Sequence, residues 1–481
     1  MKRNTIKKNF IYQSINEILI IIIPLITSPY ISRVLGVENL GVYSLSYSIV
    51  YYFQIFCMLG IRFYGTREIA KVKKDKLELS EKFSEILFAH IIISCVSIFL
   101  FTIFLLFSKV DFKFILIIQT LNIISSLLDI SWFYYGIENF KIPSVSNSLI
   151  KTTTLVLILL LVKGRNDLSL YTLIMSMSFV ISQLLLWIYL PKYTQIISVK
   201  KADIIKHFKP LFLLFIPVFA FSLFHYMDKI MLGIFSTKSH VGYYENADKV
   251  INIPLTVIFS FSTIMLSRLA SLDSKKDKDL EEKYNEYSFK YLELLAMGIC
   301  FGMFAVSPKF ATIFWGKDFL QSGYLIRVLA LTIPFSTYNN IIRTQYLMPH
   351  KKDKVYTTIM VVGAFCNLIL NYIFVKKYNS SGIAIGTLFS EILTFMISIF
   401  VTRAKLDHRK YIKSIIPFLF LGIVMSFIVI KIDCVLSISI ISLLLEIAIG
   451  FILYTTTAII YFLIKHDNVF FKIIFSKSKT T

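Results

Sequence analysis

The sequence predicts an all-α integral membrane protein with about fourteen transmembrane helices, and two observations carry this prediction. Of the 481 residues, 56% are apolar and only 17% are charged, and the mean hydropathy is +0.71. Soluble globular proteins have about 45–50% apolar and about 25% charged residues. The apolar residues also gather in runs close to the roughly 20 residues that a helix needs to cross a bilayer. A soluble enzyme, a nucleic-acid-binding module and a secreted disulfide scaffold are therefore excluded.

The runs can be followed in order along the chain, each bounded by charges or by Gly, Pro and Asn clusters. They lie at about 10–31, 42–61, 83–107, 113–135, 143–162, 169–190, 211–235, 247–267, 290–314, 324–347, 355–375, 382–402, 412–431 and 436–464. The first contains Pro24 and Pro29, and the tenth contains Arg327, Pro334 and Arg343. Prolines are tolerated at membrane depth where neighbouring groups satisfy the freed carbonyls, so we expect kinks at these positions.

The loop charges predict that both termini are cytoplasmic. With that orientation, the inner segments hold roughly three times as many Lys and Arg residues as the outer loops, as the positive-inside rule requires for short loops. The formal charge of +22 is then explained by topology, and we expect no nucleic-acid partner. We expect the chain to lie in the cell membrane. No loop exceeds about 20 residues, so we expect all binding to take place between its transmembrane helices.

A weak internal repeat predicts two equivalent lobes. The motif RVLGVENLGVYSLSYSIV at 33–50 resembles KIMLGIFSTKSHVGYYENADKV at 229–250, and Gly41 and Gly242 stand 201 residues apart. Parallel repeats of this kind occur in transporters whose two lobes are related by an axis along the membrane normal. We therefore predict an N-terminal lobe at 1–209, a C-terminal lobe at 210–408, and two further helices with a cytoplasmic tail at 409–481.

Charged side chains at membrane depth are costly unless they are paired or face water, so each is a functional candidate. The densest group forms one stripe on each of the seventh and eighth runs: His225, Asp228 and Lys229, then Glu245, Asp248, Lys249 and Asn252. One interpretation is a cavity in which Lys229 and Lys249 bind an anionic substrate. Asp228, Asp248 or His225 would then accept a coupling proton or Na⁺. The other interpretation is that Asp228 with Lys229, and Asp248 with Lys249, are structural ion pairs.

Candidates also occur nearer the N-terminus. Arg62 and Arg67 stand where the second run meets the cytoplasm, and they could bind a phosphate or serve only as positive-inside anchors. Glu17 lies in the first run beside Asn16 and is a candidate proton carrier. The aromatic run at 47–53 could stack on sugars or belong to a membrane-interface belt.

Catalytic and metal-binding motifs are missing from the sequence. It contains no Walker A sequence, no HExxH, no GxSxG, and no Cys and His residues at metal-ligand spacing. We therefore expect that the chain is not an enzyme and holds no metal or organic cofactor. A coupling H⁺ or Na⁺ is the only small ligand that we expect besides the substrate.

Three segments carry a family resemblance: PLITSPYISRVLGVENLGVYSLSYSIV at 24–50, LGIRFYGTREIAKVKKDK at 59–76 and DKIMLGIFSTKSHVGYYENADKVINIP at 228–254. They resemble the Wzx-type polysaccharide flippases of the MATE-like MOP superfamily, especially the repeat-unit transporters of Gram-positive capsule clusters. The resemblance implies two six-helix lobes plus two helices. It also implies translocation of an undecaprenyl-pyrophosphate-linked oligosaccharide by alternating access, alongside a polysaccharide polymerase and glycosyltransferases.

The resemblance also implies a contact residue. In the related lipid II flippases, a basic residue in an Ala-Asp-Arg context faces the cavity, and Ala247, Asp248 and Lys249 stand in the corresponding string. Lys249 is therefore the main candidate for a diphosphate contact. Those proteins carry arginines on the first helix, where this chain has Asn16 and Glu17.

Two other functions stay open on the sequence. One is a cation-coupled multidrug exporter of the same fold, whose cavity should be dominated by acids. The other is a polytopic polysaccharide polymerase or glycosyltransferase, which would need a long external loop with catalytic groups.

Overall fold

The computed structural model describes residues 3–269 and 278–465, and every regular element in this part of the chain is a helix. The chain divides into two compact units. Unit 1 comprises Met1–Glu245 together with Val375–Ser380, and unit 2 comprises Asn246–Phe374 together with Ser381–Thr481. The lobe boundaries inferred from the sequence repeat stay a prediction.

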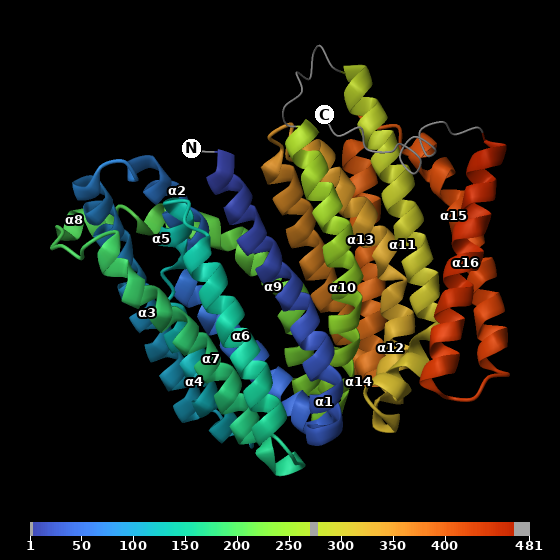
Figure 1. Cartoon of the computed structure of the whole chain (residues 1–481), viewed down its shortest axis with the longest axis horizontal. Helices are drawn as coiled ribbons and strands as arrows, with labels where there is room; N and C mark the ends of the chain where they lie inside the picture. Colours follow the sequence, from blue (N-terminus) through green and yellow to red (C-terminus); the bar gives the residue numbers. More distant parts are fainter. Residues whose placement is uncertain (1–2, 270–277, 466–481) are drawn as a thin grey trace. The chain divides into compact units, whose positions relative to one another are not determined.

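Unit 1 is built from helices that pack side by side. They are α1 (Arg3–Met58), α2 (Ile61–Val72), α3 (Lys76–Phe107), α4 (Lys113–Leu127), α5 (Ser131–Gly136), α6 (Lys141–Leu161), α7 (Leu168–Tyr189), α8 (Lys201–Ile205), α9 (Phe208–Phe235) and the start of α10 (Lys238–Leu269). In Figure 1, α7 runs beside α4 and α6, and it contacts both. The Asp75 carboxylate caps α3 by accepting hydrogen bonds from the backbone N–H groups of Leu77 and Glu78.

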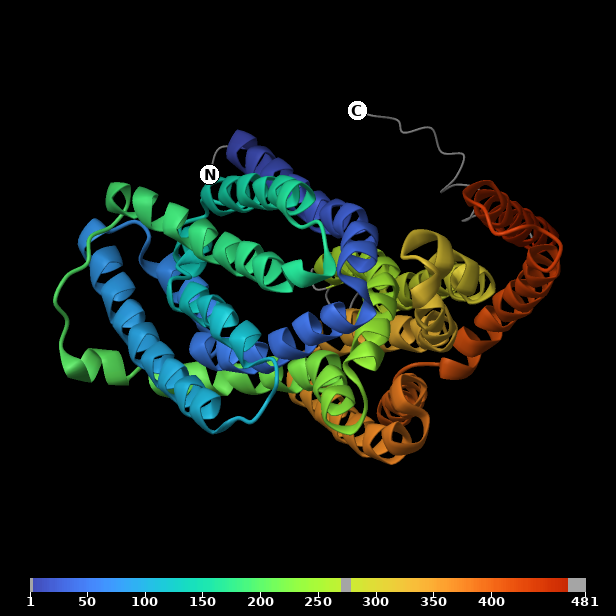
Figure 2. The same ribbon diagram turned by 90° about the horizontal axis from the view of Figure 1, so that it is seen from below.

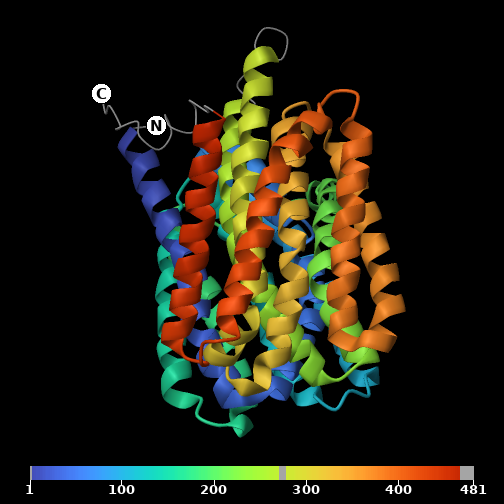
Figure 3. The ribbon, with the colours of Figure 1, turned by 90° about the vertical axis from the view of Figure 1, so that its right-hand side faces the viewer.

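Unit 2 is organised around one helix. It contains the rest of α10, α11 (Lys278–Phe314), α12 (Leu320–Ala330), α13 (Thr332–Ile341), α14 (Asp353–Thr402), α15 (His408–Asp433) and α16 (Ile440–Ile464). α12, α13, α15 and α16 all pack against α11. α15 and α16 form the antiparallel hairpin drawn in red in Figure 3, and Ser439 caps α16. A π-helical turn at Ile342–Leu347 follows α13.

Two long helices are each interrupted by one residue with positive φ. In α1 it is Gly36, with φ of 78°, and Figure 2 shows α1 turning sharply. In α14 it is Asn379, with φ of 50°. Glycine adopts this conformation without steric cost because it has no Cβ, and asparagine is among the few other residues that tolerate it.

The described residues contain eleven helices long and apolar enough to cross a membrane, or up to twelve if the bent pair Lys317–Ala330 and Thr332–Leu347 is one span. This count does not reach the predicted fourteen. The kinked helices α1 and α14 are each counted once: the runs at 10–31 and 42–61 lie on either side of the kink at Gly36, and those at 355–375 and 382–402 lie on either side of the kink at Asn379. The predicted all-α, multi-span class is confirmed.

The surface and interior of the helices suit a bilayer. Large apolar side chains such as Phe99, Leu106 and Phe107 of α3 and Ile440 and Ile441 of α16 are exposed. Lipid tails are as apolar as leucine, so such faces need no protein cover in a membrane. Many Ser, Thr, Asn, Gln and charged side chains are buried instead. Candidate functional groups are therefore found among the buried polar residues.

Candidate functional site

The first candidate site is a buried charge cluster in unit 1, where α1, α9 and α10 meet. Lys229 Nζ lies 2.6 Å from Glu245 Oε2, and the Ser44 hydroxyl donates a hydrogen bond to the same oxygen at 2.6 Å. Lys229, Glu245 and Ser44 are 7%, 8% and 3% exposed. A buried ammonium group is tolerated when an acid and further hydrogen bonds compensate its lost hydration. Lys229 is therefore a buried cation with an anionic partner.

A close helix crossing brings Ser44 to Glu245. Gly41 and Gly242 lie against each other, and a Cβ at either glycine would overlap a backbone carbonyl oxygen of the other helix. Ser44 and Glu245 each follow one of these glycines by three residues, so they lie on the same helix faces one turn further along. The two glycines of the sequence repeat thus form the contact that sets the distance between Ser44 and Glu245.

Tyrosine rings lie beside the cation. Lys229 Nζ is 5.5 Å from the centroid of the Tyr226 ring, which is within cation–π range. Tyr226 stacks on Tyr51 with 3.7 Å between ring centroids, and the Tyr47 centroid is 6.3 Å from that of Tyr226. All three rings are partly buried. The tyrosines of the aromatic run at 47–53 therefore pack inside unit 1 beside a charged group.

The other predicted residues of the seventh run lie near this cluster on α9. Asp228 is only 1% exposed, and its carboxylate accepts a hydrogen bond from the Tyr244 hydroxyl at 2.6 Å. His225 is half-buried, with its ring centroid 4.6 Å from that of Phe221. Hydrogen bonding by Tyr244 stabilises the Asp228 carboxylate at a depth where an unpaired one would be costly.

The remaining predicted residues of the membrane helices lie elsewhere. Asp248 and Lys249 follow on α10 in unit 2, where both are half-buried and Asn252 Nδ2 donates to the Asp248 carboxylate at 2.8 Å. Glu17 is on α1, and its side chain lies outside the described residues. Glu245 forms an ion pair with Lys229 in the structure. The sequence analysis placed Glu245 in the polar stripe but assigned it no role.

Arg62 and Arg67 are both exposed on α2. The Arg62 guanidinium is 5.8 Å from the centroid of the Tyr135 ring, and Arg67 Nε is 3.3 Å from a carboxylate oxygen of Glu68. Five residues of an α-helix correspond to a rotation of about 140°, so the two arginines do not share one face. Each is accessible to an anion, but they do not form one paired clamp.

A buried network in the same unit escaped the sequence analysis. The Tyr64 hydroxyl lies 2.6 Å from His207 Nδ1, and His207 Nε2 lies 3.0 Å from Glu85. Lys82 and Lys206 form ion pairs with the same Glu85 carboxylate at 2.6 and 3.0 Å. This network connects α2, α3 and the start of α9. The one signal in the sequence was an acid three residues after a lysine at the start of an apolar run.

Unit 2 contains a second buried ion cluster. Lys309 Nζ of α11 lies 2.5 Å from Glu446 of α16 and 2.7 Å from Asp433 of α15. Lys309 is 5% exposed and Glu446 is fully buried. The sequence did not single out Lys309, because it lies close to the end of an apolar run. Nowhere in residues 3–269 and 278–465 do three or more His, Cys, Asp and Glu side chains form a group that could hold a metal ion.

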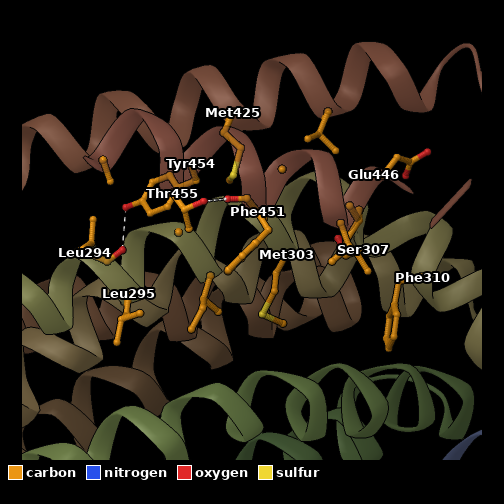
Figure 4. Close-up of a pocket in the computed structure, with 18 of the residues that line it drawn as sticks. Leu294, Leu295, Met303, Ser307, Phe310, Met425, Glu446, Phe451, Tyr454 and Thr455 are labelled. Atoms are coloured by element: carbon orange, nitrogen blue, oxygen red, sulfur yellow. Dashed lines mark hydrogen bonds between the residues drawn. The ribbon is translucent and has the colours of Figure 1, made fainter. Parts of the chain in front are cut away.

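An apolar cavity of about 550 Å³ lies in the same unit. It is lined mainly by α11, α15 and α16, and Figure 4 shows Met303, Met425, Phe451 and Tyr454 among its walls. The Tyr454 hydroxyl donates to the backbone carbonyl of Leu294 at 2.8 Å, as the dashed line in Figure 4 marks. The cavity is suited to hydrocarbon, because almost all of the residues that line it are apolar.

Comparisons with known proteins place this arrangement in a family. Residues 6–270, more than half of the chain, match the family model described as polysaccharide biosynthesis protein. A Shigella dysenteriae protein provisionally named an O-antigen transporter is 24% identical over 77% of this chain and 93% of its own length. The capsular polysaccharide biosynthesis protein CapF of Staphylococcus aureus is 24% identical over 81% of this chain and 97% of its own length.

Solved structures share the fold. The lipid II flippase MurJ in an inward closed conformation matches with a TM-score of 0.78 at 18% identity, over 94% of this chain and 99% of that one. An inward-facing MATE-family multidrug transporter of the MOP superfamily matches with a TM-score of 0.62 at 14% identity, over 79% and 94% of the two chains. The predicted MATE-like fold and the resemblance to Wzx-type flippases are thereby confirmed. The chain belongs to the polysaccharide biosynthesis protein family.

Proposed function

We propose that this chain is a flippase that moves undecaprenyl-pyrophosphate-linked oligosaccharide repeat units from the cytoplasmic to the outer leaflet, for synthesis of a capsule or another surface polysaccharide. The family match and the names of its relatives support the class of cargo. The observation that carries the proposal is Lys229, a cation buried in a membrane protein beside tyrosine rings. A diphosphate linked to sugars needs both an ammonium partner and surfaces on which sugars stack.

Glu245 gives Lys229 a partner while no cargo is bound. Its Oε2 atom accepts a hydrogen bond from the Ser44 hydroxyl and lies 2.6 Å from the ammonium group, to which an anion of the cargo would bind. In the proposed cycle, the diphosphate replaces Glu245 at Lys229, and Glu245 keeps its hydrogen bond to Ser44. The exchange keeps an anion at Lys229 throughout, and it requires Glu245 to be protonated or hydrated once it has left, because a buried carboxylate without a cation costs several kcal/mol.

The other predicted residues have parts in the same proposal. Lys249 on α10 would also contact the diphosphate, and the exposed Arg62 and Arg67 would attract it from the cytoplasmic leaflet. Asp228, Asp248, His225 and Glu17 would take part in coupling to a gradient of H⁺ or Na⁺. This assignment agrees with the proposed orientation in the cell membrane, with both termini in the cytoplasm.

The apolar cavity of unit 2 suits the lipid part of the cargo. Its walls of Met303, Met425 and Phe451 can contact part of a prenyl chain, and its volume of about 550 Å³ fits several isoprene units. Glycosyltransferases would act before this step on the cytoplasmic side of the membrane, and a polymerase would act after it on the outer side. The chain itself would move the cargo without changing its bonds.

The proposal is tested by complementing cells deleted for the gene with Lys249→Ala and Lys229→Met variants. With expression adjusted so that each variant reaches wild-type abundance, we expect both to yield at least tenfold less surface polysaccharide. Lys317→Met, an exposed lysine on the turn before α12, is the matched control and should support normal synthesis. Normal polysaccharide with both variants would remove their proposed role, and resistance to organic cations on overexpression would favour a drug exporter.

A further inference from the structure

A carboxylate in the interior of unit 2 has no role in the site described above. Glu293 of α11 is 1% exposed, and its Oε1 atom is buried with no hydrogen-bond partner in the described part of the chain. No ion pair of Glu293 occurs among the described residues. It therefore differs from Glu245 and Glu446, which both form ion pairs with buried lysines.

The face of α11 that carries Glu293 points toward the interior of unit 2. Asn285, Phe289 and Glu293 follow at intervals of four residues and are 3%, 1% and 1% exposed. The Phe289 ring packs against Tyr338 of α13 and Tyr411 of α15, with centroids 4.6 and 4.3 Å away. Glu293 lies one turn from this aromatic contact, and its side chain is shielded from water in this conformation.

Among the described residues, three titratable groups couple electrostatically to Glu293, and none of them is a cation. They are Cys300 on the same helix, Tyr338 on α13 and Tyr454 on α16. Both tyrosine hydroxyls already have partners: that of Tyr338 lies 2.8 Å from His408 Nδ1, and that of Tyr454 donates to the Leu294 carbonyl at 2.8 Å. Neither tyrosine hydroxyl is therefore free to serve as an oxygen ligand of a Na⁺ ion, and the experiment below distinguishes Na⁺ from a proton.

We propose that Glu293 is a proton-binding site, protonated in the conformation described here. An ionised carboxylate without a cation is far more costly in such a surrounding than a neutral carboxyl group, so proton binding is the change that this position favours. On α13, which packs against α11, Thr337 Oγ1 and Asn340 Oδ1 are also buried without partners. Water that enters when the helices move would meet these atoms, and Glu293 would then release its proton.

Infrared difference spectroscopy of the purified full-length protein in lipid membranes tests the site without any cargo. At neutral pH, the wild type minus Glu293→Gln spectrum should contain the C=O band of one protonated carboxyl group, which shifts in ²H₂O. The control is Glu282→Gln, an exposed acid on the same helix, whose difference spectrum should contain carboxylate bands instead. If Glu293→Gln does not fold, Glu293→Asp should keep the protonated band at a shifted position. Carboxylate bands in the Glu293 difference spectrum, or Na⁺-dependent ones, would overturn the proposal.

A second measurement links the site to transport, and this step rests on the proposed function. In cells, a protonophore should lower the rate at which lipid-linked saccharide reaches the outer face at least tenfold for the wild type and less than twofold for Glu293→Gln. Equal sensitivity of the two would show that Glu293 does not couple transport to the proton gradient. Absence of translocation by the wild type would contradict the flippase proposal alone, because the infrared result does not depend on cargo.

Discussion

The pairing of Lys229 with Glu245 illustrates what a sequence can and cannot predict for a single residue. Helical periodicity placed Lys229 on a polar face, and the cost of burying its charge made it a candidate. The partner lies sixteen residues further on, across a helix crossing. No local pattern specifies that crossing, so the sequence left open whether the lysine was a binding group or part of a structural pair.

A pair of single and double variants separates these two roles. Lys229→Met leaves Glu245 buried without its cation and should destabilise the protein by about 3–5 kcal/mol. Lys229→Met combined with Glu245→Gln removes both charges and should recover most of that stability. Thermal unfolding of the purified proteins measures this difference.

The same double variant should still fail in polysaccharide synthesis, since it lacks the ammonium group that the diphosphate needs. Normal synthesis by a stable double variant would show that the pair is only structural.

Substitution of Arg62 and Arg67 should affect stability less than substitution of Lys229, because both arginine side chains are exposed. Replacing them together with Gln should change the free energy of unfolding by less than about 0.5 kcal/mol each, as is usual for surface residues. The transport rate should fall several-fold if they attract the anionic cargo. Lys71→Gln on the same helix provides the control. A double Arg variant with an unchanged rate at low ionic strength would contradict the proposed attraction.

At the scale of helices, the sequence predicted most of the elements and the two interruptions in α1 and α14, but not which residue makes each turn. Charges and apolar runs located nearly all of the helices, because a span must satisfy its backbone hydrogen bonds within itself. The turns at Gly36 and Asn379 are each made by a single residue with non-helical φ and ψ angles, so α1 and α14 each consist of two helices that meet at a kink. The repeat, in contrast, contributed a contact that its spacing alone could not predict, between Gly41 and Gly242.

The glycine contact can be tested with a matched pair of substitutions. Gly41→Ala adds a methyl group where the Lys238 carbonyl oxygen lies, so the helices must separate, and we expect destabilisation of about 1–3 kcal/mol. Gly302→Ala on α11 adds the same group where the nearest atom is 4.0 Å away, and it should be neutral or stabilising. The two midpoints of thermal unfolding give the comparison. Equal midpoints would contradict a close crossing at Gly41.

The α15–α16 hairpin should depend on Lys309. Lys309→Met leaves Glu446 and Asp433 without their shared cation and should loosen the hairpin, at a cost of about 3–5 kcal/mol. Limited proteolysis in the turn between the two helices should become faster, whereas Lys317→Met should leave it unchanged. Unaltered proteolysis of both variants would show that packing alone holds the hairpin.

For the molecule as a whole, composition was sufficient to predict the class, and the resemblance to the flippases predicted the fold that the comparisons confirm. The interior was less predictable. Lys309 and Glu85 have ordinary sequence surroundings, and their burial follows from which helices pack together. When each helix is considered alone, the sequence shows that a charged residue in an apolar run is costly to bury. It does not show which residue of another helix compensates that charge.

The central claim concerns which side of the membrane the cargo reaches. The most direct measurement is to extract the lipid-linked saccharides from cells deleted for this gene, identify them by mass spectrometry, and determine their sidedness with an impermeant glycan-oxidising reagent. The proposal predicts completed repeat units that are protected from the reagent on the cytoplasmic face. Completed units exposed on the outer face would contradict it and point to a polymerase or ligase, and an unchanged lipid pool would point to the export of another substrate.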